Sequence, residues 1–196
     1  MGRLVIAVDC DDVLVRTTPY FVDAYNKTYG TNVVLEYAHQ DDYAGWGTDR
    51  STLESRLAEL MGTDEYKQLS PSAEEVVVLT NLSKDHELHV ITARRAHERE
   101  LTQLMLDTYL PGVFTSLELV GFTGSKGEVC RRIGATVLID DNVRHLEDAV
   151  KHGLPSQGAI LFGDYPWNVQ ENISAGVIQC ATWHDVSREV HGLARQ

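Results

Sequence analysis

The chain has 196 residues, 43% of them hydrophobic and 23% charged, so it can bury a full core, and its length fits one domain with a sizeable insertion. Its formal net charge of -12 argues against a nucleic-acid polymer as partner, because proteins that follow a phosphate backbone do so with basic surfaces. It has no apolar stretch long enough to cross a membrane, no secretory signal pattern and three widely spaced cysteines, which together predict a cytoplasmic protein without a membrane partner.

The first predicted element along the chain is a buried strand over Leu4–Val8, because this run is short, apolar and rich in β-branched residues. The following residues show a mainly helical pattern, with helices predicted over Pro19–Tyr29 and Ser51–Leu60 and an aromatic loop between them. A regular alternation of strand and helix begins only after this stretch. We therefore expect a small helical cap, residues 16–70, inserted after the first strand of a core made of residues 1–15 and 71–196.

From residue 71 onward, strands and helices alternate. The predicted strands cover residues 88–91, 117–120, 136–139, 159–162 and 177–180. The predicted helices cover residues 73–83, 96–109, 126–133, 143–152 and 185–193. Helices between consecutive strands act as right-handed crossovers, which build a parallel sheet covered on both faces. The expected fold class is therefore α/β, a three-layer, Rossmann-like arrangement around a parallel sheet.

Acidic residues follow two of the predicted strands: Asp9 and Asp11 follow the first, and Asp140 and Asp141 follow the strand over 136–139. The carboxyl ends of parallel strands meet at one edge of the sheet, which is where such sheets bind ligands. A lone acidic cluster at a strand end more often caps the next helix and faces solvent. Four carboxylates at one buried edge, however, would repel one another, and a divalent cation such as Mg²⁺ would offset that repulsion.

Two further strand ends carry polar residues of the kinds that phosphoryl transfer requires. Thr92, Ala93 and Arg94 follow the strand over 88–91, and Lys126 opens the helix after the strand over 117–120. A carboxylate nucleophile, a second acid, a hydroxyl with backbone donors, a cation and metal-binding carboxylates together provide the groups needed to transfer a phosphoryl group. Arg94 can either contact substrate or pair with surface acids.

This order of residues resembles the haloacid dehalogenase (HAD) superfamily of phosphohydrolases. The residues that match its four motifs are Asp9 and Asp11, Thr92, Lys126, and the pair Asp140 and Asp141. The resemblance implies that Asp9 is the nucleophile that becomes an aspartyl-phosphate. It implies that Asp11 is the general acid and base, a role that requires a proton when the leaving group departs. Burial under a closed cap is expected to favour that proton.

The same resemblance implies how phosphate and metal are held. Thr92 and the backbone amide of Ala93 would bind the phosphoryl oxygens, and Lys126 would pair with both the phosphate and Asp9. The implied ligands of Mg²⁺ are Asp9, Asp141 and the backbone carbonyl of Asp11, with Asp140 either a direct ligand or a neighbour of one.

The predicted cap lies between the first and second motifs, where it would fold over the strand edge and exclude water. Its aromatic residues Tyr20, Phe21, Tyr43 and Trp46 either clamp a planar base or form the cap's own core. The aromatic loop and residues 164–168 are similar to segments of the 5'(3')-deoxyribonucleotidase family.

This second similarity implies a magnesium-dependent phosphatase of deoxyribonucleoside monophosphates. The alternatives are a HAD phosphatase of other small phosphorylated metabolites and a non-catalytic phosphate-binding module. For the enzymes, the partner is a small phosphorylated substrate. The sequence leaves open whether the chain forms a homodimer.

Overall fold

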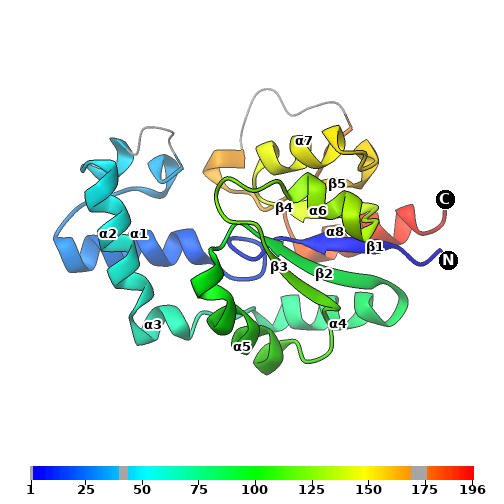
Figure 1. Cartoon of the computed structure of the whole chain (residues 1–196), viewed down its shortest axis with the longest axis horizontal. Coiled ribbons are helices and arrows are strands. Elements are labelled where there is room, and N and C mark those ends of the chain that lie inside the picture. The colour runs from blue at the N-terminus through cyan, green and yellow to red at the C-terminus, as the bar shows by residue number, and fades with distance from the viewer. Residues whose placement is uncertain (1, 40–43, 169–175) are drawn as a thin grey trace.

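The computed structural model describes residues 2–39, 44–168 and 176–196. Within these ranges, six parallel strands form one sheet in the order β3-β2-β1-β4-β5-β6 (Figure 1). The strands are β1 (Val5–Val8), β2 (Glu87–Thr92), β3 (Ser116–Leu119), β4 (Val137–Asp140), β5 (Ala159–Phe162) and β6 (Ile178–Cys180). The parallel α/β sheet predicted from the sequence is confirmed.

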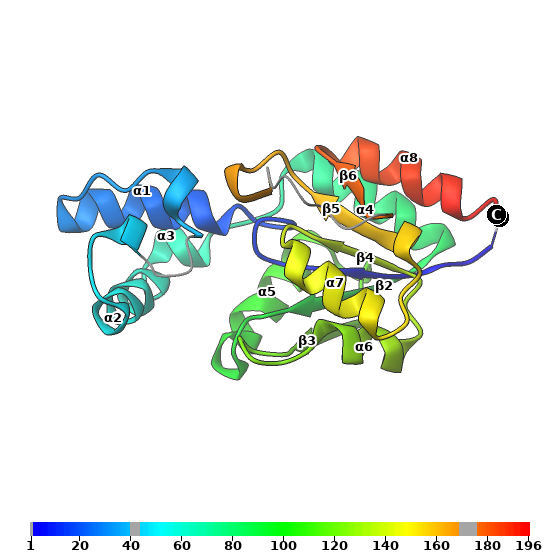
Figure 2. The same ribbon diagram turned by 90° about the horizontal axis from the view of Figure 1, so that it is seen from above.

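Helices cover both faces of this sheet, as the view from above shows (Figure 2). The helices that do so are α4 (Ala73–Asp85), α5 (Arg99–Tyr109), α6 (Lys126–Ile133), α7 (Val143–Lys151) and α8 (Trp183–Leu193). Side chains of α4, α5 and α8 share one buried cluster with the first face, and those of α6 and α7 share a second cluster with the other face. The core also contains the short 3-10 turns η3 (Ala96–Glu98), η4 (Ser156–Gly158) and η5 (Pro166–Asn168).

The alternation of side chains along the strands directs two acidic residues to the same side of the sheet. In β1, Ile6 and Val8 join the cluster under α4, α5 and α8, whereas Ala7 joins the cluster under α6 and α7. Because side chains of a strand alternate with a period of two, Asp9 continues the series of Ala7. Asp140 likewise continues the series of Leu138, which belongs to the α6 and α7 cluster. Both acids therefore point toward the side on which α6 begins.

The sheet changes its winding direction between its two central strands. The chain builds β2 and β3 on one side of β1, and it builds β4, β5 and β6 on the other side. Such a switch point leaves a crevice beyond the carboxyl ends of the central strands, which is the usual ligand site of an open parallel sheet. The ends of β1 and β4 are thus the place at which the fold favours a ligand.

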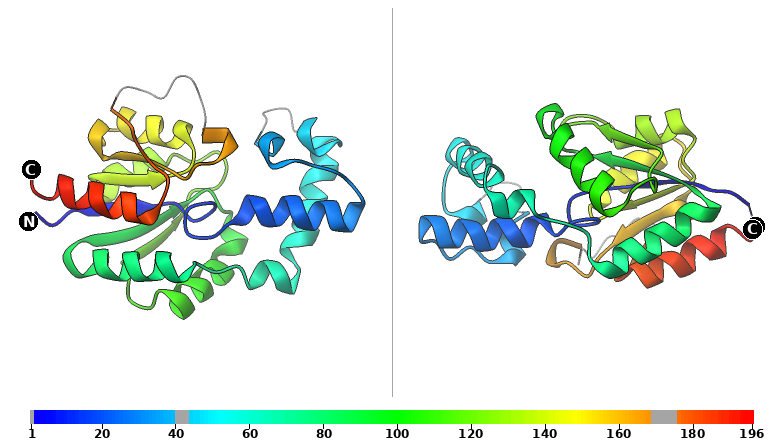
Figure 3. Two further views of the ribbon diagram at one scale, coloured as in Figure 1. Left: turned by 180° about the vertical axis from the view of Figure 1, so that it is seen from behind. Right: turned by 90° about the horizontal axis from the view of Figure 1, so that it is seen from below.

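Three helices between β1 and α4 lie beyond the carboxyl ends of the strands, as Figures 1 and 3 show. They are α1 (Thr17–Tyr29), α2 (Arg50–Met61) and α3 (Asp64–Lys67), accompanied by the 3-10 turns η1 (Leu35–Tyr37) and η2 (Ala44–Trp46). We call residues 17–67 the helical unit. Its buried cluster, which includes Tyr25, Trp46 and Leu53, is distinct from both clusters of the core.

The helical unit contains one helix that the sequence did not predict. α3 has only four residues, which is too short for a hydrophobic period, and its N-terminus is fixed by the Thr63 side chain, which accepts a hydrogen bond from the Tyr66 amide. In the described ranges, no helix has the length and apolar composition to cross a membrane. The three cysteines are free, as the sequence predicted.

Candidate active site

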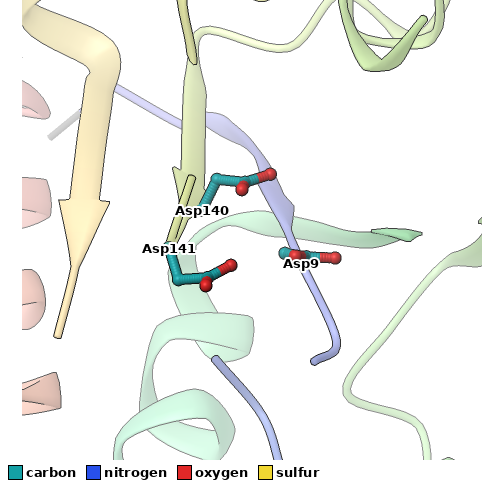
Figure 4. Close-up of side chains that lie close together, drawn as sticks. All are labelled: Asp9, Asp140 and Asp141. Carbon is teal, nitrogen blue, oxygen red and sulfur yellow. The ribbon is translucent and has the colours of Figure 1, made fainter. Parts of the chain in front are cut away.

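Three carboxyl groups meet where β1 and β4 end. Asp9 follows directly after β1, Asp140 is the last residue of β4, and Asp141 comes next. The side chains of Asp140 and Asp141 extend from the end of β4 toward the side on which Asp9 lies (Figure 4). Each of the three residues offers an oxygen, and these oxygens lie within 4.8 Å of one another. All three residues are buried.

Lys126 supplies positive charge to this cluster from the first position of α6. The helix begins there because the Ser125 side chain accepts a hydrogen bond from the Glu128 amide. The fully buried Lys126 Nζ lies 2.8 Å from Asp9 Oδ1 and 2.7 Å from Asp140 Oδ2. When all three carboxyl groups are ionised, the ammonium of Lys126 balances one of their three negative charges. The two that remain are the number that one divalent cation would balance.

Burial raises the pKa of all three carboxyl groups. For Asp9, burial is the largest cause, the charge of Lys126 opposes it, the charges of Asp140 and Asp11 add to it, and the resulting pKa is about 7. Asp9 is then only partly ionised at neutral pH. A bound cation would favour the ionised form of each group.

The donor set fits Mg²⁺, which prefers hard oxygen ligands. Both oxygens of Asp140 are occupied, since Oδ2 bonds to Lys126 and Oδ1 accepts the Asn142 amide at 3.0 Å. For Asp141, the described residues contribute one bond, from the Trp167 indole nitrogen to Oδ2 at 2.8 Å. Asp141 and Asp9 are therefore better placed to bind a metal directly than Asp140, which is held by Lys126.

The end of β2 provides a hydroxyl beside backbone amides. Thr92 is fully buried, and its Oγ1 accepts a hydrogen bond from the Arg94 amide at 3.2 Å. Since the hydroxyl accepts this bond, its own hydrogen remains able to point to a phosphoryl oxygen. Ala93, half-buried, lies between them.

Asp11 occupies a different environment from Asp9, although only one residue separates them. Its Oδ1 accepts hydrogen bonds from Thr17 Oγ1 at 2.6 Å and from Arg94 Nη2 at 2.7 Å. Burial raises the pKa of Asp11, but the charge and hydrogen bonds of Arg94, with the bond from Thr17, outweigh burial and hold this pKa below its usual value. Burial thus acts in the direction expected from the sequence, but the net shift is the opposite one because the sequence-based expectation did not include Arg94.

Arg94 does not pair with surface acids, one of the two roles the sequence left open for it. The residue is buried, with a relative exposure of 7%. Its guanidinium binds Asp11, and its Nη1 donates to Thr102 Oγ1 at 3.0 Å. The pairing joins residues 83 positions apart, so no local pattern could reveal it.

The aromatic residues of the helical unit mainly contact one another. Trp46 is 5% exposed, its ring meets Tyr25 edge-on at 5.0 Å, and its indole nitrogen donates to the Ala38 carbonyl. Tyr20 and Phe21 are half-buried and pack against Tyr66, with ring centroids 5.7 and 5.4 Å away. Tyr43 lies outside the described residues. The structure therefore favours the packing role for Trp46, and it places Tyr20 and Phe21 at the junction with α3.

Trp167 is a site residue that the sequence reasoning did not identify as one. Besides its bond to Asp141, its ring stacks on Tyr165 at 4.5 Å and on His39 of the helical unit at 4.2 Å. Through this stack His39, a residue of the helical unit, contacts the side chain that donates a hydrogen bond to Asp141, a candidate metal ligand. The available sequence signal was the aromatic run at 164–168, which follows β5 at the same sheet edge.

Comparisons with known proteins identify a family that the chain matches. A profile of the family described as "5' nucleotidase, deoxy (Pyrimidine), cytosolic type C protein" matches residues 3–195. No curated protein sequence matches the chain significantly.

Solved structures of HAD-type proteins share the fold. A haloacid dehalogenase-like family hydrolase from Xanthomonas campestris has a TM-score of 0.60 and 16% identity, covering 100% of this chain and 97% of that one. A predicted phosphatase from Clostridium acetobutylicum has a TM-score of 0.67 and 12% identity, covering 98% and 100%. L-2-haloacid dehalogenase from Xanthobacter autotrophicus has a TM-score of 0.66 and 13% identity, with the same coverage. At these identities the likeness shows the fold alone.

The family match extends over nearly the whole chain, and the fold is that of HAD hydrolases. The protein is accordingly an enzyme, a phosphatase of the nucleotidase kind with a HAD-like fold. The chain belongs to the deoxy-5'-nucleotidase family of cytosolic type C.

Proposed function

We propose that the protein is a Mg²⁺-dependent phosphomonoester hydrolase that works through an aspartyl-phosphate at Asp9. The observation that supports this most strongly is the buried ammonium of Lys126 between Asp9 and Asp140, beside a third carboxylate. A fixed cation next to a carboxylate nucleophile attracts a phosphate dianion to the atom that must attack it.

Asp9 is oriented for attack by two donors. Its Oδ1 accepts hydrogen bonds from Lys126 Nζ at 2.8 Å and from the Cys10 amide at 2.7 Å. These contacts fix the carboxylate and leave Oδ2 to form the bond to phosphorus as the bond from phosphorus to the leaving oxygen breaks. Bound Mg²⁺ would supply the positive charge that keeps Asp9 ionised and balances the phosphoryl oxygens. Lys126, the Thr92 hydroxyl and the Ala93 amide would bind those oxygens.

Asp11 carries the protons in this scheme. It gives a proton to the leaving oxygen when the aspartyl-phosphate forms. Arg94 and Thr17 hold the pKa of Asp11 below its usual value in the substrate-free site, so this step requires the negative charge of the bound phosphate to raise that pKa and let Asp11 take up the proton. It then takes a proton from the water that attacks phosphorus, the bond between Asp9 and phosphorus breaks, and inorganic phosphate leaves. Such proton transfers contribute about 10²- to 10⁴-fold to a rate.

We further propose that residues 16–70 act as a cap over this site. The supporting contacts are the stack of His39 on Trp167 and a hydrogen bond of 3.4 Å from the Tyr66 hydroxyl to Glu98 at the end of η3. A unit held over the strand ends excludes water from the aspartyl-phosphate and presents side chains to the leaving group.

The proposed substrate is a deoxyribonucleoside monophosphate, which the family description supports. A wider range of small phosphomonoesters is the second candidate. The burial of Trp46 in the helical unit favours it, because one of the aromatic residues that could have clamped a base is engaged in packing instead.

Phosphate release from nucleotides, sugar phosphates and phosphoamino acids, measured with Mg²⁺ present, tests both candidate substrate classes. The proposal predicts that deoxyribonucleoside monophosphates are turned over fastest and that EDTA abolishes release. Equal rates on all of these substrates would contradict the proposed nucleotide preference but not the phosphatase activity. Turnover unaffected by EDTA would contradict the proposed dependence on Mg²⁺.

A further inference from the structure

One carboxylate of α7 holds the start of α6, where Lys126 lies. Asp148 Oδ2 accepts hydrogen bonds from the Ser125 hydroxyl at 2.7 Å and from the Gly127 amide at 2.9 Å. Ser125 and Gly127 are the two chain neighbours of Lys126, so a single oxygen fixes the backbone on both sides of the lysine. The two bonds join residues 23 and 21 positions apart, and no local sequence pattern indicates them.

The two helices approach one another at this point too closely for any residue but glycine. A Cβ added at Gly127 would lie 2.5 Å from the Asp148 carbonyl oxygen and 2.6 Å from His152 Nδ1. Helices α6 and α7 lie side by side over the same face of the sheet, and their side chains share one buried cluster (Figure 2). The backbone at the start of α6 therefore has little room to shift relative to α7.

Asp148 is held as an ionised acceptor. Its Oδ1 lies 3.3 Å from His152 Nδ1. Burial raises the pKa of Asp148, but the hydrogen bonds from the Gly127 amide and the Ser125 hydroxyl outweigh burial and hold this pKa below its usual value. The carboxylate is therefore charged at neutral pH, and a charged acceptor binds amides and hydroxyls more strongly than a neutral one.

The position of the Lys126 backbone matters because its side chain has a flexible four-carbon stem. The Nζ at the end of that stem lies 2.8 Å from Asp9 Oδ1 and 2.7 Å from Asp140 Oδ2. We propose that Asp148 is a positioning residue that fixes the backbone of Lys126 and so keeps its ammonium between these two carboxylates. The inference rests on the proposed role of Lys126 in binding the phosphoryl oxygens. A misplacement of about 1 Å at a catalytic site can cost roughly 100-fold in rate.

The first test measures kcat/KM for p-nitrophenyl phosphate with Mg²⁺ present. Asp148→Ala removes both bonds and should lower kcat/KM about 10- to 100-fold. Asp148→Asn should restore most of this loss, because both bonds end at one oxygen and an amide oxygen can accept them. Ser125→Gly removes one of the two bonds and keeps a residue that is accepted at an N-cap, so it should show a smaller loss.

Glu128 provides the matched control. It is exposed in the first turn of α6, and Glu128→Ala removes one negative charge near the same helix end. This variant should keep the kcat/KM of the parent. Thermal melts identify variants that do not fold, and Ser125→Gly decides if Asp148→Ala is one of them.

A double-mutant cycle measures whether Asp148 acts through Lys126, with inorganic phosphate as the probe. Asp148→Ala should raise the Kd for phosphate about 10-fold, the size expected when a hydrogen bond to a charged group is weakened. In a Lys126→Met background the same substitution should leave this Kd unchanged, because the ammonium that Asp148 positions is absent.

Equal effects of Asp148→Ala on the Kd in both backgrounds would overturn the positioning role. A loss of kcat/KM as large in Asp148→Asn as in Asp148→Ala, or no loss in a folded Asp148→Ala protein, would also overturn it. Lys126→Met separates this failure from failure of the proposed function. If Lys126→Met lowers kcat/KM sharply and Asp148→Ala does not, only the positioning role is wrong. If Lys126→Met keeps the kcat/KM of the parent, the proposed role of Lys126 is itself wrong.

Discussion

At the scale of single residues, Lys126 is the side chain that balances the negative charge of Asp9 and Asp140. It is buried and contacts Asp9 and Asp140, and removing one partner of a buried ion pair costs about 3–5 kcal/mol. We expect Lys126→Met to lower the free energy of unfolding in urea by about that amount at pH 7 without metal. The deficit should shrink at pH 5, because Asp9, whose pKa is raised by burial to about 7, is then protonated and no longer needs the ammonium to balance its charge.

A substitution on the surface of α7 provides the control for this measurement. Lys151 is exposed, and Lys151→Met should change the free energy of unfolding by no more than about 0.5 kcal/mol. A Lys126→Met protein as stable as the parent at pH 7 would show that the carboxylates do not depend on the ammonium.

The residues of the site differ in how far sequence could predict them. Asp9, Thr92 and Asp140 follow apolar strands, so their meeting at one sheet edge follows from the topology of parallel sheets. The partners of these residues were not predictable in the same way. The contact between Arg94 and Asp11, like that between Trp167 and Asp141, depends on how loops from separate strands approach one another, and no spacing within one segment records it.

At the scale of secondary structure, α1 shows how a loop starts a helix. Arg16, at the N-cap position, offers no side-chain hydrogen bond. Asp12, six positions before Thr18, caps the helix instead. Its Oδ1 accepts a hydrogen bond from the Thr18 amide at 3.0 Å, and its carboxylate also accepts one from the Thr18 hydroxyl. Asp12 reaches this position with a φ of +57°, which among the described residues other than glycine is found here alone.

Replacement of Asp12 tests this capping. Asp12→Ala should lower the free energy of unfolding by about 1–2 kcal/mol, since the cap is lost and alanine disfavours a positive φ. Asp12→Asn should lower the free energy of unfolding by less, because asparagine keeps an acceptor oxygen and tolerates a positive φ. Asp23, exposed on α1, provides Asp23→Ala as the control. Equal stability of Asp12→Ala and the parent in chemical denaturation would exclude the capping role.

The larger elements followed from the sequence, whereas several helix ends and the shortest elements did not. The bounds of all six strands lie within one residue of the predicted ones, and β1, β4 and β5 were the clearest because apolar, β-branched runs of four or five residues mark buried strands. The predicted helix over 96–109 is divided, with a 3-10 turn at 96–98 before α5. There the Glu98 side chain accepts the Arg95 amide at 2.8 Å, a local contact that hydrophobic spacing does not register.

At the scale of the whole molecule, metal binding should couple to pH. Because burial raises the pKa of Asp9, Asp140 and Asp141 above their values in the unfolded chain, protons compete with Mg²⁺ for these groups, at Asp9 below about pH 7. The increase in Tm produced by Mg²⁺ should therefore be small at pH 5 and grow as the pH rises through 7.

Differential scanning fluorimetry with and without Mg²⁺ measures this coupling. Taking the difference at each pH removes the contribution of groups remote from the site. The Asp141→Asn protein should lose most of the increase in Tm that Mg²⁺ produces, at every pH. A Tm increase of the same size at pH 5 and pH 8 would contradict competition between protons and metal at these carboxylates.

The proposed mechanism requires that Asp9 becomes phosphorylated during turnover. Acid quench of the enzyme within the first turnover, followed by mass spectrometry of the peptide that contains Asp9, measures this directly. The wild-type protein with Mg²⁺ and p-nitrophenyl phosphate should carry a phosphoryl group on Asp9, and Asp9→Asn should carry none and release no phosphate. Undiminished phosphate release by Asp9→Asn, or a phosphoryl group on another residue, would exclude Asp9 as the nucleophile.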